Sequence, residues 1–354
     1  MNFTLSIVLF VATFLFTSVL MRLFFPLIPT KEPLDFSNKA GLPLLFGISI
    51  GWIIALLVMP FNLWQENGFV FGLYPFAISA LTLSFYCIQK GRFSRFTFYL
   101  LITSLSVFFL PQNAYVFQGI FTLPIDRFLT ALLWAGFISL YGKMDKAQHL
   151  TMLQSQFLCF GFIGFALLTP KISSLSYLFT CYPALILAAI LAYQKTKKKV
   201  PHISLGKTGA IPLGYLMGLF FILLAQKGFY LAALVMPAYY YFEAIYSSFV
   251  KIRSHYAHQP TVLTFYITRV MQEKMNHKKI IPALMSIMAF LMALALVVGN
   301  DLKMALLAML IIFAYLFNKL SRIDQPKIRI RDVWHDTKEA TAILFGNLKD
   351  SSPK

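Results

Sequence analysis

Long apolar runs alternate with short polar segments along most of the chain. A helix must be about 20 residues long to cross a hydrocarbon core of about 30 Å. Because lipid offers the backbone no hydrogen bonds, such runs predict helices; a β-barrel would show short alternating segments. The expected fold is all-α and polytopic, with eleven transmembrane spans at about 3–24, 41–60, 68–88, 96–111, 126–142, 148–169, 173–194, 209–226, 228–249, 280–299 and 302–319.

The composition supports this pattern. Of 354 residues, 58% are hydrophobic and 12% are charged, which is too apolar for a soluble protein of this size. The first run is long and has no Lys or Arg ahead of it, so it is interpreted as a span rather than a cleaved signal peptide. We expect one membrane domain, residues 1–320, and a charged cytoplasmic tail, residues 321–354. Within the tail, 336–348 predicts a short amphipathic helix on the membrane surface.

The basic residues predict the orientation. If the N-terminus lies outside and the spans alternate, 27 of the 31 Lys and Arg fall on the inner side or in the tail. The positive-inside rule therefore favours an N-out, C-in protein whose longer loops face the cytoplasm. Orientation and anionic lipid headgroups account for the net charge of +18. Nucleic acid is not an expected partner, because the basic runs lack interleaved stacking aromatics.

Three local patterns suggest chemistry, and each also has an ordinary explanation. The segment 203–210, "ISLGKTGA", is either a phosphate-binding loop or a glycine-rich start to the eighth span; Pro201 stands where the phosphate-loop pattern needs glycine. His255 and His258 are either a metal-binding pair or a solvated loop pair. Glu243 is either a buried functional carboxylate or a snorkelling residue at the end of a span. The three cysteines lack the spacing of a disulfide framework or metal site.

The segment 123–150, "LPIDRFLTALLWAGFISLYGKMDKAQHL", ends its apolar run at Lys143, Asp145 and Lys146. An aspartate at a helix end beside lysines ordinarily forms a local ion pair of little consequence. The segment also resembles the central signature of the polyprenyl-phosphate N-acetylhexosamine-1-phosphate transferases. In that family a Trp-containing helix leads into Asn-x-x-Asn-Phe-Met-Asp-Gly-x-Asp-Gly-Leu. The resemblance implies that Asp145 derives from a catalytic motif.

Other segments follow in the family's order. The stretch 87–101 is similar to one that holds an Asp-Asp pair, and 204–215 is similar to the Met-Gly-Asp-Ala-Gly-Ser segment. The stretch 236–252 resembles an Ile-Pro-x-x-Asp span, and 41–47 resembles the Pro-Thr-Pro-Arg-Gly-Gly stretch of the first loop. The resemblance covers about residues 1–320. It implies ten or eleven spans, an N-out topology, and a cytoplasmic active site that uses Mg²⁺, a UDP-sugar and undecaprenyl phosphate.

The chain departs from the family at the motifs that hold the metal. Ile88 and Gln89 replace the Asp-Asp pair, Asp145 alone remains of Asp-Gly-x-Asp-Gly, and Lys207 replaces another aspartate. Mg²⁺ requires hard oxygen ligands, so Asp145 is at most one possible ligand and Lys207 would repel the ion. We therefore expect no cofactor, with Mg²⁺ retained only if the protein is active.

The resemblance implies a catalytically degenerate homologue in a bacterial inner membrane. It would retain a cytoplasmic groove that binds a polyprenyl phosphate or a nucleotide-sugar, although the same lysines also serve positive-inside topology. Two alternatives stay open: an active transferase with an altered site, and a transporter or partner subunit of a glycan enzyme. A transporter should show inverted repeats, which are not evident. The predicted binding residues are Lys90, Lys143, Lys146, Gln148, Gly206, Lys207 and Gly209, with Asp145 as the catalytic candidate.

Overall fold

The computed structural model describes about half of the chain, and every regular element in that half is a helix. The described residues are 2–24, 41–59, 61, 77–78, 80–81, 95–108, 110, 116–117, 120–144, 150–169, 176–197, 205–242, 244, 289–296, 307, 310–311 and 314. The chain divides into two compact units, Met1–Met309 and Leu310–Lys354. The predicted tail, 321–354, lies outside the described residues.

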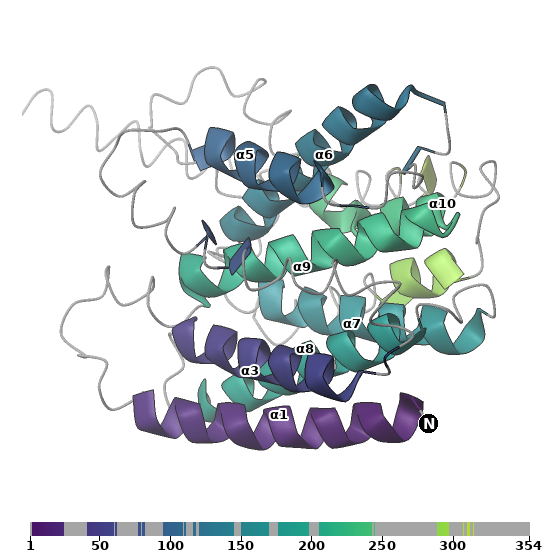
Figure 1. Cartoon of the computed structure of the whole chain (residues 1–354). Coiled ribbons are helices and arrows are strands. Elements are labelled where there is room, and N and C mark those ends of the chain that lie inside the picture. The colour runs from purple at the N-terminus through teal and green to yellow at the C-terminus, as the bar shows by residue number, and fades with distance from the viewer. Residues whose placement is uncertain are drawn as a thin grey trace, which may run out of the picture. The chain divides into compact units, whose positions relative to one another are not determined.

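The first unit is a helical bundle (Figure 1). Its labelled helices are α1 (Asn2–Phe24), α3 (Leu42–Val58), α5 (Arg95–Phe108), α6 (Leu123–Met144), α7 (Leu150–Leu168), α8 (Ser176–Lys197), α9 (Gly206–Gln226) and α10 (Tyr230–Val235). Seven of them, α1 to α9, begin and end within three residues of a predicted span. Hydropathy alone therefore located these helices.

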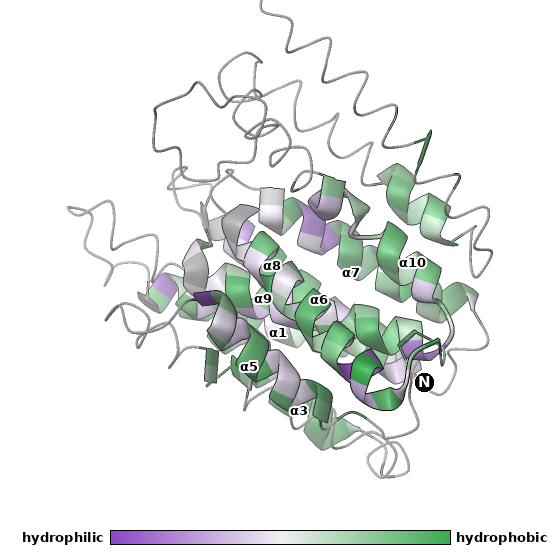
Figure 2. Cartoon of the chain, turned by 90° about the horizontal axis from the view of Figure 1, so that it is seen from above, coloured by the Kyte–Doolittle hydropathy of each residue, from purple (hydrophilic) through white to green (hydrophobic). Residues whose placement is uncertain are grey.

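Within the described residues, five helices are long and apolar enough to cross a membrane: α1, α6, α7, α8 and α9. The helices α3 and α5 are shorter but also apolar. Figure 2 shows that hydrophobic residues predominate on the visible sides of most of these helices. Helices that are apolar all round are typical of a membrane protein. The chain is therefore an all-helical membrane protein in the part that the structure describes.

The predicted ninth span, 228–249, is interrupted. Gly228 adopts a positive φ of 90° in the turn after α9, and the short helix α10 follows. The helix breaks at Met236 and Pro237 and resumes at Ala238. Proline supplies no backbone N–H and crowds the preceding turn, so the break falls where the sequence places it. Of the predicted third, tenth and eleventh spans, only separate stretches lie among the described residues.

Two helices form the centre of the bundle. In the apolar stretches of α8 and α9, 89% and 94% of the residues are buried, respectively, whereas only 28% are buried in the apolar stretch of α1. α8 packs against α1, α3 and α7, and α9 packs against α3, α6, α7 and α10. The outer side of α1 exposes large apolar residues such as Val8, Leu15 and Leu23. Such a side matches lipid, which is as apolar as these side chains.

α1 and α3 pack closely because small residues face each other. A Cβ on Gly51 would lie 2.6 Å from Thr13 Oγ1, and one on Gly47 would overlap Thr17. The pairing is antiparallel, as expected of consecutive spans. Glycines four residues apart let two membrane helices approach closely. The hydroxyl oxygens of Thr13 and Thr17 are buried and have no hydrogen-bond partner, so this contact is purely steric.

Candidate functional site

A second glycine pair joins α9 to α6. A Cβ on Gly214 would lie 2.8 Å from Tyr141 Cβ, and one on Gly218 would overlap the indole of Trp134. The two helices are antiparallel, and each glycine opens space for one aromatic side chain. Any larger residue at Gly218 would displace the indole. We call this contact between Trp134, Tyr141, Gly214 and Gly218 the α6–α9 seam.

Directional hydrogen bonds reinforce the seam. The Trp134 Nε1–H donates to the Tyr215 carbonyl at 3.0 Å, and the two rings stack with centroids 4.6 Å apart. The Tyr215 hydroxyl donates to Ser106 Oγ at 3.0 Å, and Ser106 donates to the Ile102 carbonyl at 2.8 Å. Because all of these groups are buried, each bond satisfies a group that water cannot reach. The chain of bonds fixes α5, α6 and α9 relative to one another.

Tyr141 joins the end of the seam to further elements. Its hydroxyl forms a hydrogen bond with Ser155 Oγ in α7, and Ser155 donates to the Thr151 carbonyl at 2.6 Å. Its ring stacks on Tyr240 with centroids 5.1 Å apart and planes 20° apart. Tyr141 therefore places α7 and the residues after Pro237 beside the last turns of α6.

Backbones meet where α9 begins. Gly206 has a left-handed φ of 67°, which favours glycine. A Cβ on Gly41, at the start of α3, would overlap the backbone of Leu205 and Gly209. A Cβ on Gly142, near the end of α6, would lie 3.3 Å from Ile211 Cγ1. The beginnings of α3 and α9 and the end of α6 thus meet, and we call this region the Gly209 end of the bundle.

The predicted binding residues fall around the Gly209 end or outside the described residues. Gly206 and Gly209 form its first turn, and the backbones of Lys143 and Lys207 lie in the last turn of α6 and the first turn of α9. The side chains of these two lysines are outside the description. The same holds for the whole of Lys90, Asp145, Lys146 and Gln148. The basic groove therefore stays a prediction, whereas the meeting of the helix ends that would form it is a structural finding.

Of the local candidates, the predicted phosphate loop proves to be a helix start, and the other candidates lie outside the described residues. In the segment 203–210, Gly206 begins α9, which is the glycine-rich helix start expected of the ordinary interpretation. Glu243, His255 and His258 are outside the described residues. Within the described part of the chain, no three His, Cys, Asp or Glu side chains gather into a group that would hold a metal ion.

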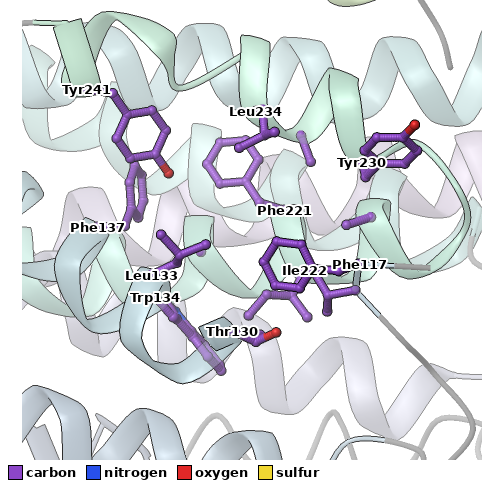
Figure 3. Close-up of a pocket in the computed structure, with 14 residues that line it drawn as sticks. Phe117, Thr130, Leu133, Trp134, Phe137, Phe221, Ile222, Tyr230, Leu234 and Tyr241 are labelled. Atoms are coloured by element: carbon purple, nitrogen blue, oxygen red, sulfur yellow. The ribbon is translucent and has the colours of Figure 1, made fainter. Parts of the chain in front are cut away.

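An apolar pocket lies between α6, α9 and α10, nearer the other end of the seam (Figure 3). Its volume is about 100 Å³. Leu133 and Leu234 are 48% and 43% exposed, so they mark an opening at the outer face of the bundle. Trp134 and Gly218 belong to both the pocket and the seam. The pocket is lined by Val116, Phe117, Thr130, Leu133, Trp134, Phe137, Gly218, Phe221, Ile222, Ala225, Tyr230, Ala233, Leu234 and Tyr241.

A buried carboxylate fixes one wall of this pocket. Asp126 is 1% exposed; its Oδ1 accepts the Val116 N–H at 3.1 Å, and its Oδ2 accepts the Phe117 N–H at 2.8 Å. The Thr130 hydroxyl donates to the Asp126 carbonyl at 2.7 Å. The region around Asp126 is called the Asp126 end of the bundle. The predicted fifth span starts at Asp126, whereas α6 begins at Leu123 and Asp126 is its fourth residue.

Comparison with known proteins adds no family assignment. No family model matches the chain, and a search of curated proteins finds no match.

Proposed function

We propose that this chain is a catalytically degenerate homologue of the polyprenyl-phosphate sugar-1-phosphate transferases of bacterial envelope glycan synthesis. It lies in the bacterial inner membrane with eleven spans, N-out and C-in. Its Gly209 end faces the cytoplasm and binds a polyprenyl phosphate, or the phosphates of a nucleotide-sugar, without turnover.

One observation carries the proposal: segments that resemble the family's site motifs meet in space. Gly41 belongs to 41–47, Gly142 to 123–150 and Gly209 to 204–215, and all three lie at the Gly209 end. Tyr240, in the segment 236–252, stacks on Tyr141 beside them. These segments are far apart in the sequence. Alternation of the spans alone would bring these segments to one side of the membrane; the support comes from the close contacts of Gly41 with the α9 backbone and of Gly142 with Ile211.

The start of α9 suits an anion. Leu205 at the N-cap makes no side-chain hydrogen bond to this helix, and the first N–H groups of an α-helix have no partner within the helix itself. Such N–H groups and the helix dipole favour phosphate. Lys207 is the second residue of the helix and adds a positive charge near this turn. The family carries an aspartate at the matching position, where it serves a metal. The substitution replaces a metal-centred site with one that neutralises phosphate directly.

The proposal is tested by lipid binding. Native mass spectrometry of the purified full chain should show undecaprenyl phosphate binding in excess chelator, with an affinity that falls as salt rises. Lys207→Asp should weaken this binding by about tenfold, which corresponds to one lost charge-assisted contact. Lys227→Asp makes the same change at the opposite end of α9 and should leave the affinity unaltered. Binding no tighter than that of undecaprenol, the neutral alcohol, would refute the proposal.

The proposed topology has its own test. In a cysteine-free background, single cysteines in 195–199 should react with an impermeant reagent from the cytoplasmic side only. A cysteine at Lys171 or Lys227 should react only from the outside. Labelling of 195–199 from the outside would exclude the eleven-span arrangement without touching the proposed lipid chemistry.

A further inference from the structure

Arg127 forms no ion pair with another residue in the part of the chain that the structure describes. It follows Asp126 in α6, and its Nη2 is buried without a hydrogen-bond partner. The neighbouring Asp126 carboxylate is directed elsewhere: its two oxygens accept the backbone N–H groups of Val116 and Phe117. A partly buried guanidinium without an anion is unfavourable next to lipid. None of the described residues supplies this negative charge, so a bound anion would complete the site.

The apolar pocket begins one helical turn away. Thr130, which lines the pocket, is three residues after Arg127. Side chains at this spacing are neighbours on a helix surface, with Cβ atoms about 5–6 Å apart. The pocket opens between Leu133 and Leu234 onto the outer face of the bundle, where a membrane protein meets lipid chains. The positive charge of Arg127 therefore lies beside the apolar pocket, on the side nearer the start of α6.

We propose that Arg127 and this pocket form a binding site for one glycerophospholipid of the leaflet at the Asp126 end. The lipid phosphate accepts hydrogen bonds from the Arg127 guanidinium, and one acyl chain enters the pocket between α6 and α10. Asp126 has a supporting role: it holds Val116 and Phe117 as the pocket wall. An amphiphile with a single anionic head and a hydrocarbon chain matches both halves of the site.

This site is separate from the one at the Gly209 end. Thr130 and Lys143 are 13 positions apart in α6, which corresponds to about 20 Å along the helix axis. A headgroup on Arg127 therefore lies near the opposite membrane surface from one on Lys207. The inference does not rest on the proposed function, and each can fail alone. In the proposed topology the phospholipid belongs to the outward leaflet.

Binding of two lipids that differ only in the anionic phosphoglycerol headgroup tests the headgroup contact. The purified full chain is titrated with dioleoylphosphatidylglycerol and with dioleoylglycerol, and bound lipid is counted by native mass spectrometry. The phospholipid should bind at least about tenfold more tightly. Arg127→Gln should remove this preference, whereas Lys227→Gln, a matched loss of charge at the end of α9, should retain it. A preference that survives Arg127→Gln would overturn the proposal.

Fluorescence quenching tests the position of the chain. Trp134 lines the pocket, so a phosphatidylglycerol with brominated acyl chains should quench a component of the emission that is missing in Trp134→Phe. Ala225→Phe, which fills the pocket from α9, should abolish that quenching, provided that the variant keeps its thermal unfolding midpoint. If it does not, Ala233→Phe fills the pocket from α10. Unchanged quenching in a folded filled-pocket variant would refute the site. Displacement of the phospholipid by equimolar undecaprenyl phosphate would show that the occupant is an isoprenoid instead.

Discussion

Two helix contacts in this bundle, the α1–α3 seam and the α6–α9 seam, have glycines four residues apart. They differ in the side chains that pack against those glycines. On α3, Gly47 and Gly51 pack against two threonines of α1, whose hydroxyls are buried without a hydrogen-bond partner. On α9, Gly214 and Gly218 pack against aromatic side chains of α6, and one of these side chains donates a hydrogen bond to the α9 backbone. The first seam is steric, whereas the second is steric and directional.

The difference matters for function. A steric seam holds two helices close but tolerates any residue pair of the same combined size. In the directional α6–α9 seam, Trp134 must keep both its ring position and its N–H partner. That seam also leads at one end to the Gly209 end and borders the apolar pocket with Trp134 and Gly218. The proposed sites thus lie along the more constrained of the two seams.

The largest expected effect comes from Gly218→Ala. The added methyl group would overlap the Trp134 indole, so the ring must move and its bond to the Tyr215 carbonyl is lost. We expect a loss of about 3 kcal/mol in the free energy of unfolding, measured by denaturant unfolding in detergent. Gly136→Ala is the matched control, because a Cβ there meets nothing within 4 Å. An equal loss in both variants would show that the seam is not tightly packed.

Gly47→Ala should have a smaller effect, and a second change should relieve it. The new methyl group would overlap Thr17, at a cost of about 2 kcal/mol. Thr17→Ala in the same chain removes the overlapping atoms and should restore most of the stability. The corresponding pair in the other seam, Gly218→Ala with Trp134→Ala, should not recover, because the hydrogen bond and the ring stack stay lost. Rescue in both seams would remove the distinction between them.

The smallest effects on stability are expected from the removal of single hydroxyl groups, and these effects differ between the two seams. Tyr215→Phe should cost about 1 kcal/mol, because the bond to Ser106 disappears. Thr13→Val should be neutral or stabilising, because the hydroxyl that it removes is buried and has no partner. Thermal unfolding of both variants in the same detergent would compare them. A destabilised Thr13→Val would mean that the α1–α3 seam depends on its hydroxyl groups after all.

The sequence predicted the helices better than it predicted their contacts. Apolar runs located α1 to α9 because lipid and backbone hydrogen bonding constrain length and composition strongly. Pro237 signalled a break, but the prediction treated 228–249 as continuous. The glycine spacing of 214 and 218 gave no indication of which helix it faces, because that depends on tertiary packing.

The candidate sites were likewise predicted where they depend on the local sequence and missed where they depend on tertiary contacts. Gly206 and Gly209 were predicted near a helix start and lie there. In contrast, the role of Asp126 depends on two backbone N–H groups about ten residues earlier, which no local pattern reveals. No sequence pattern singles out Arg127, and the lack of a hydrogen-bond partner for its buried Nη2 becomes visible only in the structure.

We propose that this chain retains the site of the family it resembles without that family's chemistry. The most direct test is a transfer assay with the purified full chain, UDP-N-acetylglucosamine or UDP-N-acetylgalactosamine, undecaprenyl phosphate and Mg²⁺. We predict no lipid-linked sugar phosphate, because the motifs keep only Asp145 of the carboxylates that would hold the metal. Product that requires Mg²⁺ and disappears in Asp145→Asn would contradict this account and establish an active transferase.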